Sequence, residues 1–184
     1  MAKEQKKKKE SGSIYDNYKL SDVQTRGAAG PRFELGTHVV KLVSWTAFVS
    51  RKRETNVGVR FKVIESDNPK HKKGSYIDTL FNLDDADGLG LSRIKNLLIA
   101  LAGWDASEDE EKIEEVDDSD WVDMLKEGDA KGYNGVSVIA VVTPYTTKAG
   151  RELLKRDPSA REDAGFAKFE TTVVSYQRIE ESDE

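Results

Sequence analysis

Positively charged residues form the clearest clusters of side chains that could do chemistry in this 184-residue chain. One cluster is Arg51-Lys52-Arg53, a second lies within residues 70–73, and a third follows residue 147. Lysine and arginine bind polyanions because they release counterions from phosphate groups. The clusters therefore favour binding of a nucleic acid over a catalytic reaction. The alternative is that these charges are only solvated surface.

Residues that serve catalysis or metal binding are scarce. The chain has no cysteine, which excludes disulfides and thiolate zinc sites, and its two histidines, His38 and His71, are far apart in sequence. Asp85-x-Asp87-Gly88 resembles part of a calcium loop, but Leu83 occupies the first ligand position and no glutamate stands at the twelfth. No nucleotide-binding loop of the Gly-x-x-x-x-Gly-Lys-Ser/Thr type is present. We therefore expect no enzyme activity, no cofactor and no metal site.

Charge is distributed unevenly along the chain. The net charge is −5, but residues 105–129 contain thirteen acidic residues against two lysines, a local net charge of −11, and residues 180–184 add −4. The rest of the chain therefore carries +10, and a basic body with separate acidic stretches suits a protein that binds polyanions. We expect residues 105–129 to be mobile apart from a short helix at 121–126. We also expect the acidic stretches to fold over the basic face when no DNA is bound.

The elements that must position these side chains can be read from apolar periodicity. Residues 36–49 are rich in β-branched and aromatic residues, and residues 57–64 alternate apolar and polar side chains, so both segments predict strands. Residues 75–83, 133–145 and 165–179 predict three more. Residues 91–101 place leucine and isoleucine on one helical face, and Asp87 or Ser92 can cap this helix while Gly103 can end it.

The order of these elements predicts a mainly β protein. Five strands with one helix after the third are typical of the OB-fold, a partly open Greek-key barrel. We expect residues 33–179 to form this barrel, with residues 105–129 as an acidic insertion. Residues 1–32 are expected to be a disordered basic arm, and residues 180–184 an acidic tail.

In the OB-fold the loops between strands 1 and 2 and between strands 4 and 5 flank a groove across strands 2 and 3. We therefore expect the separate basic clusters to converge on one groove, where Trp45 and Tyr76 would be exposed for stacking with bases. The alternative for each aromatic side chain is packing within the barrel. The predicted nucleic-acid-binding residues are Trp45, Arg51, Lys52, Arg53, Arg60, Lys62, Lys72, Lys73, Tyr76, Lys148, Arg151, Lys155 and Arg156.

Several segments together resemble a known family. The segments FELGTHVVKLVSW, RIKNLLIALAG, YNGVSVIAVVTPYTTKAGRE and FAKFETTVVSYQRI, with the acidic end EESDE, are similar to the OB-fold single-stranded DNA-binding proteins of tailed bacteriophages. The resemblance covers about residues 33–184. It implies sequence-independent coating of single-stranded DNA during phage DNA replication and recombination, in the cytoplasm of the bacterial host. It also implies that the acidic tail recruits replication or recombination proteins, although the tail lacks the terminal phenylalanine of many bacterial relatives.

A different class of function is the principal alternative. An OB-like barrel could be a protein-interaction module that assembles with replication or recombination enzymes through the acidic segment 105–129. No apolar run approaches the roughly 20 residues of a membrane-spanning helix, so we expect no membrane association. The exposed edge of such a barrel would allow a homodimer.

Overall fold

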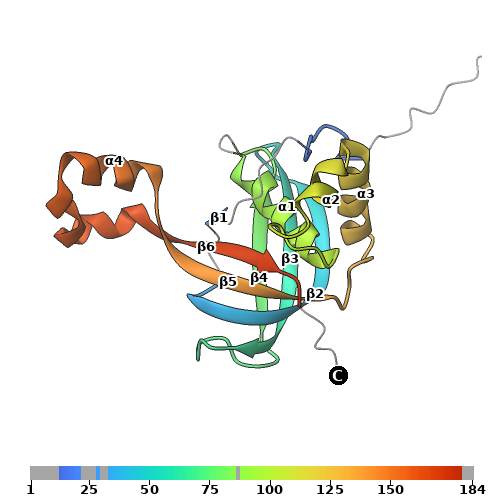
Figure 1. Ribbon diagram of the computed structural model, residues 1–184, viewed down its shortest axis with the longest axis horizontal. Helices are drawn as coiled ribbons and strands as arrows, with labels where there is room; N and C mark the ends of the chain where they lie inside the picture. Colours follow the sequence, from blue (N-terminus) through green and yellow to red (C-terminus); the bar gives the residue numbers. More distant parts are fainter. Residues whose placement is uncertain (1–12, 22–27, 30–32, 86–87, 180–184) are drawn as a thin grey trace, which may run out of the picture.

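One antiparallel sheet organises the protein. A computed structural model describes residues 13–21, 28–29, 33–85 and 88–179. The sheet has the strand order β1–β6–β5–β2–β3–β4, and every neighbouring pair is antiparallel (Figure 1). The strands are β1 (Ala28–Ala29), β2 (Gly36–Val49), β3 (Thr55–Ser66), β4 (Tyr76–Asn82), β5 (Ser137–Thr146) and β6 (Glu170–Gln177). The helices are α1 (Leu89–Leu101), α2 (Glu110–Glu115), α3 (Asp118–Asp129), α4 (Lys148–Arg156) and the 3-10 turns η1 (Pro158–Glu162) and η2 (Ala164–Phe169).

The connection order follows a Greek key. Strands β2, β3 and β4 are joined in sequence, and β5 returns after the helices to lie beside β2. Three consecutive strands followed by a fourth that pairs with the first define this motif. The mainly β architecture and the position of α1 after the third long strand are therefore confirmed.

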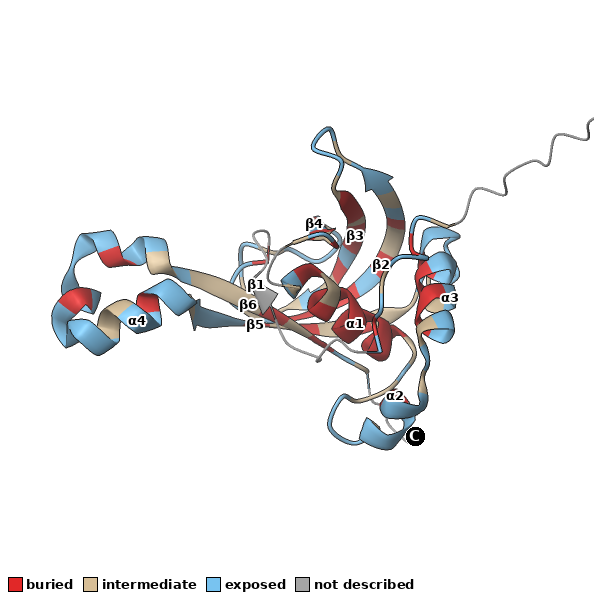
Figure 2. Ribbon diagram, turned by 90° about the horizontal axis from the view of Figure 1, so that it is seen from above, coloured by how far each residue is buried: buried red, intermediate tan, exposed pale blue. Residues whose placement is uncertain are grey.

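Strand β2 bends the sheet around α1. Its first residues, Gly36–Lys41, pair with β5 on one side, while residues 38–49 pair with β3 on the other. Register shifts occur between Val39 and Val40 and between Leu42 and Ser44, and an inserted residue bends a strand and increases its twist. As a result β5 and β6 lie on one side of α1, and β3 and β4 on the other (Figure 2).

Alternation in β3 decides which face is buried. Val57, Val59, Phe61 and Val63 are buried, as their period of two predicts. Helix α1 contacts β4 and β6, lies in the same core cluster as these residues, and is buried along almost its whole length. Its polar residues Ser92, Arg93, Lys95 and Asn96 are buried together with its leucines and isoleucines. Sheet and helix thus share one core, whose largest buried side chains include Trp45, Phe81 and Trp121.

The sheet is not closed into a barrel, contrary to the expectation. Among the described residues β4 pairs only with β3, and β6 pairs with β5 and β1. Helix α1 fills the gap between β4 and β6. Its Asn96 forms the hydrogen bonds to the β6 backbone that a neighbouring strand would otherwise form. Its side chain donates to the carbonyl of Tyr176 at 3.2 Å and accepts from the N–H of Tyr176 at 2.6 Å. The backbone of β6 is satisfied at this point by a side chain, so no further strand can pair there.

The ends of α1 differ partly from the expectation. Gly103 adopts the left-handed conformation with φ of 77°, as predicted for the residue past the end. The first turn is held by Asp85, whose carboxylate accepts from the N–H of Gly90 at 2.8 Å. Ser92 lies inside the helix and is buried, so it is not the cap, and Asp87 lies outside the described residues.

Residues 13–21 belong to the folded body, which corrects the predicted boundary at residue 32. Tyr15 and Leu20 are fully buried in the core. The Tyr18 hydroxyl donates to Asp84 at 2.6 Å, and burial together with this carboxylate raises the pKa of Tyr18 to about 12. Isolated apolar residues in a polar segment show no periodicity, which is why the sequence pattern missed this packing. The rest of the predicted arm and the tail 180–184 lie outside the described residues.

The acidic segment 105–129 is built into the fold, so the expectation of a mobile stretch is wrong. Helix α3 begins at a cap where Asp117 accepts from the N–H groups of Ser119 and Asp120. Its Trp121 and Leu125 are fully buried.

No helix in the described part of the chain is both long enough and apolar enough to span a bilayer.

Candidate nucleic-acid interface

The outer faces of β2, β3 and β4 form one continuous surface, which we call the β2–β4 face. The strand register aligns its side chains in rows across the three strands, because residues directly opposite in paired strands share a face. The rows are Lys41, Lys62 and Tyr76; then Ser44, Arg60 and Asp78; then Thr46, Gly58 and Leu80, followed by Phe48 at the end of β2.

Large apolar side chains are exposed on the β2–β4 face. Tyr76 is 60% exposed, Phe48 45% and Leu80 42%. Phe48 leans towards Gly58, where an added Cβ would lie 3.7 Å from the phenyl ring. A shallow hollow of about 390 Å³ lies between Phe48, Leu80 and the centre of the face. Flat and apolar side chains exposed together on a sheet are the kind of surface on which unpaired bases stack.

Cations are interspersed among these apolar residues. Lys41 and Lys62 are exposed and directly opposite each other on β2 and β3. Arg60 forms two hydrogen bonds with Asp78, at 2.6 Å and 2.9 Å. The Asp78 carboxylate holds the pKa of the Arg60 guanidinium above its usual value. The face therefore offers flat stacking surfaces beside positive charge.

A basic loop lies at each end of the β2–β4 face. The β2–β3 hairpin carries Arg51, Lys52 and Arg53, all exposed, next to the end that holds Phe48. The β3–β4 loop carries Lys72 and Lys73, also exposed, next to the end that holds Tyr76. Of the predicted site residues, the structure thus brings together Arg51, Lys52, Arg53, Arg60, Lys62, Lys72, Lys73 and Tyr76.

The β3–β4 loop is tied to the chain just before β2. The backbone N–H of Glu34 donates to Nε2 of His71 at 3.0 Å, and Lys70 pairs with the Glu34 carboxylate at 3.1 Å. The ring of His71 lies 4.9 Å from that of the buried His38. Burial and the neighbouring His38 lower the pKa of His71. A neutral His71 can accept this hydrogen bond and so hold the loop in place.

Trp45 is not an exposed stacking surface, so this prediction is wrong. It is 1% exposed and lies against α3, where a Cβ added to Gly128 would come within 2.9 Å of the indole. The reason is the bulge in β2: Val43 has no partner in β3, so the alternation is inverted after Leu42. If β2 alternated regularly through Val43, without the bulge, Trp45 would point outward with Lys41.

The basic residues of the β5–β6 connection lie apart from the β2–β4 face. Gly36 pairs with Val142, and β5 continues beyond it into α4, whereas the hairpin 50–54 lies at the opposite end of β2. Figures 1 and 2 show α4 and the two 3-10 turns projecting away from the body as an arm. The expected convergence of both basic loops is therefore wrong, and the arm holds the predicted residues Lys148, Arg151, Lys155 and Arg156.

Two of the predicted arm cations, Arg151 and Lys155, have partners within the arm or at its base. The Arg151 guanidinium lies 5.2 Å over the Tyr145 ring and donates to the carbonyl of Thr146. Lys155 pairs with Glu152 at 2.9 Å. The arm has its own small core around Phe166 and Gly150. It is an ordered extension of β5 and β6 rather than a basic loop beside the groove.

The acidic segment 105–129 lies on the core side of β2. Gly128 packs against Trp45, and the Asp129 carboxylate accepts from the N–H of Ala47 at 3.1 Å. Trp45 points away from the β2–β4 face, so α3 does not cover that face. The expectation that residues 105–129 fold over the basic surface is therefore wrong.

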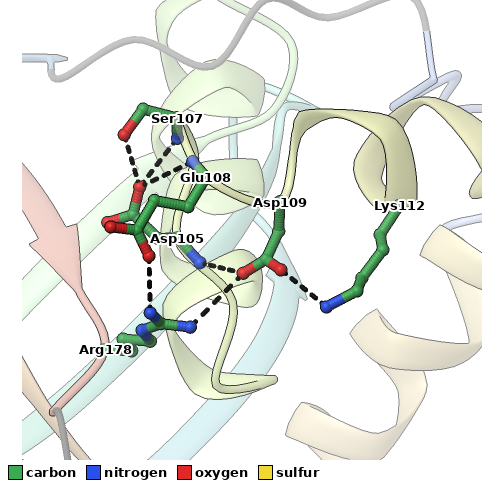
Figure 3. Close-up of polar contacts among 6 residues, drawn as sticks. All are labelled: Asp105, Ser107, Glu108, Asp109, Lys112 and Arg178. Atoms are coloured by element: carbon green, nitrogen blue, oxygen red, sulfur yellow. Dashed lines mark hydrogen bonds and ion pairs between the residues drawn. The ribbon is translucent and has the colours of Figure 1, made fainter.

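Arg178 fastens the start of the acidic segment to the end of β6. Figure 3 shows its guanidinium between Glu108, at 2.7 Å, and Asp109, at 3.5 Å. Lys112 lies 2.6 Å from the other side of the Asp109 carboxylate, and this contact is the main cause of the lowered pKa of Asp109. The hydroxyl of Ser107 likewise lowers the pKa of Asp105. These carboxylates are engaged by cations and hydroxyls of the chain, and no group of three or more within the described ranges could hold a metal ion.

The sequence reading missed part of the β2–β4 face. Lys41, Phe48, Asp78 and Leu80 were not among the predicted site residues, although Lys41 lies in a row with Lys62 and Tyr76, and Asp78 in a row with Arg60. Their common signal is strand register, which the alternation of a single strand does not reveal.

Comparisons of the chain with protein-family models, with curated proteins and with solved structures find no match.

Proposed function

We propose that the chain binds single-stranded DNA without sequence preference on the β2–β4 face and has no catalytic step. The observation that carries this proposal is the combination on one surface of exposed Tyr76, Phe48 and Leu80 with Lys41 and Lys62, between two basic loops. Stacking on aromatic side chains and counterion release act on any base sequence, since every base has a flat face and every nucleotide a phosphate.

An OB-like fold is part of the proposal. The Greek-key order and a helix after the third long strand support it, and the β2–β4 face includes the two strands that bind ligands in that fold. A sheet left partly open is compatible with it, because the OB-fold is itself a partly open barrel. The resemblance to phage single-stranded DNA-binding proteins supports a role in coating DNA during replication and recombination.

The experiment is an equilibrium titration of fluorescently labelled oligo-dT at several salt concentrations between about 50 and 200 mM, the range over which phosphate contacts weaken strongly. We expect micromolar or tighter binding that weakens steeply with salt. A duplex of equal length serves as the control and should compete poorly, because its bases are not free to stack. Absence of oligo-dT binding at the lowest salt concentration would contradict the proposal.

The same titration tests a second candidate, assembly with replication or recombination enzymes through the acidic segment. The observation that favours it is a row of exposed carboxylates on α2 and α3, which α3 holds in place through buried Trp121 and Leu125. The exposed carboxylates of the two helices are Glu110, Glu111, Glu114, Glu115, Asp120, Asp123, Glu127 and Asp129. Under this candidate oligo-dT would not bind at low salt.

A further inference from the structure

Arg60 differs from the other cations of the β2–β4 face because its guanidinium is held in one orientation. Nε lies 2.6 Å from one oxygen of Asp78 and Nη2 lies 2.9 Å from the other. Two parallel hydrogen bonds of this kind fix the plane of the guanidinium as well as its position. The two residues are directly opposite in the register of β3 and β4, so both backbones support the geometry.

The same pairing makes Arg60 a poor ligand for phosphate. The Asp78 carboxylate neutralises the positive charge at the centre of the face and would repel a phosphate placed there. Lys62, two residues further along β3, is exposed on the same face and forms no ion pair within the described part of the chain. Counterion release on this face is therefore expected from Lys62 rather than from Arg60.

The guanidinium nevertheless remains accessible and adjoins an aromatic ring. The side chain of Arg60 is 53% exposed and that of Asp78 is 40% exposed. The Cζ atom of Arg60 lies 6.0 Å from the centroid of the Tyr76 ring. Two flat groups from neighbouring strands thus lie close together on the face, with the guanidinium over the tyrosine ring.

We propose that Arg60 stacks on a base instead of contacting a phosphate, and that Asp78 is the positioning residue that holds it for this purpose. The inference rests on the proposed function and specifies how its site recognises single strands. Unpaired bases stack on arginine guanidinium planes as they do on aromatic rings. Arg60 and Tyr76 then take up neighbouring bases, which a duplex cannot offer.

The test compares three variants by the salt dependence of oligo-dT binding. Arg60→Ala and Arg60→Lys should both weaken binding about 5- to 150-fold, which is the range for loss of one stacked base. The salt slope, by which we mean the magnitude of the slope of log K against log salt concentration, should equal that of the unaltered protein. Lys62→Ala is the matched control on the same strand, and it should lower the slope by about 0.7. An oligonucleotide carrying 2-aminopurine should lose part of its stacking-induced fluorescence change with both Arg60 variants but not with Lys62→Ala.

The role of Asp78 is tested by Asp78→Asn. Without the carboxylate, Arg60 becomes free to contact a phosphate, so the salt slope should rise by about 0.7. An unchanged slope would overturn the positioning role. The stacking role would be overturned if Arg60→Lys bound as tightly as the unaltered protein, or if Arg60→Ala lowered the slope as Lys62→Ala does. If the unaltered protein does not bind oligo-dT at all, the proposed function fails instead.

Discussion

His71 is the residue through which pH should act on the fold. Its Nε2 accepts from the N–H of Glu34 at 3.0 Å, and a protonated imidazole cannot accept. Burial and nearby His38 lower the pKa of His71 in the folded chain, so the unfolded chain binds the proton more tightly. Stability from this contact should therefore be complete above the ordinary pKa of about 6.5 and fall as the pH drops towards the lowered value.

Urea unfolding between about pH 5 and pH 8 measures this effect around the ordinary histidine pKa. His71→Gln keeps a hydrogen-bond acceptor but cannot titrate, so the variant should lose this part of the pH dependence. Equal pH dependence in both proteins would show that His71 does not carry the effect.

Tyr76 should matter for binding and not for stability. Its side chain is 60% exposed, so Tyr76→Ala removes little buried surface, whereas loss of one stacking platform costs about 1–3 kcal/mol of binding free energy. Buried Trp45 provides the contrast, since Trp45→Ala should lower the free energy of unfolding by about 3–5 kcal/mol. Oligo-dT titration and urea unfolding of both variants check these expectations. A Tyr76→Ala variant that binds normally would remove Tyr76 from the site.

Among the elements, α1 fills the gap that pairing between β4 and β6 would close in a complete barrel. Asn96 on α1 satisfies both the N–H and the carbonyl of Tyr176. Asn96→Ala would leave these two buried backbone groups without partners, at a cost of about 2–4 kcal/mol in the free energy of unfolding. The exposed Asn134 is a matched control, and Asn134→Ala should change stability by less than about 0.5 kcal/mol. Similar losses in both variants by urea unfolding would contradict this role of α1.

The elements also show how far the sequence could predict the structure. The alternation of Val57, Val59, Phe61 and Val63 predicted β3 and the outward direction of Arg60 correctly, because a period of two is a local property of a strand. The position of Trp45 depended on a single bulge residue, Val43, which no local pattern reveals. The gap filled by Asn96 depended on a contact between residues 80 positions apart.

At the scale of the whole molecule, β2 separates two surfaces of opposite charge. The β2–β4 face and its two basic loops lie on the outer side, while α3 packs on the core side against Trp45. The placement of a loop relative to a face depends on strand register and on which end of a strand each connection leaves. For this reason the sequence correctly predicted that the β2–β3 hairpin lies beside the outer face of β3, but wrongly placed the β5–β6 connection there.

The most direct test of the β2–β4 face compares two triple variants that remove the same charge. One replaces Arg51, Lys52 and Arg53 with alanine, and the other replaces Lys148, Lys155 and Arg156 of the arm. The measurement is the salt dependence of oligo-dT affinity. If the hairpin contacts phosphates, the first variant should bind more weakly with a salt slope lower by up to about 2, and the arm variant should keep the slope of the unaltered protein. An unchanged salt slope in the hairpin variant, or a larger loss of oligo-dT affinity in the arm variant, would contradict binding of DNA at the β2–β4 face.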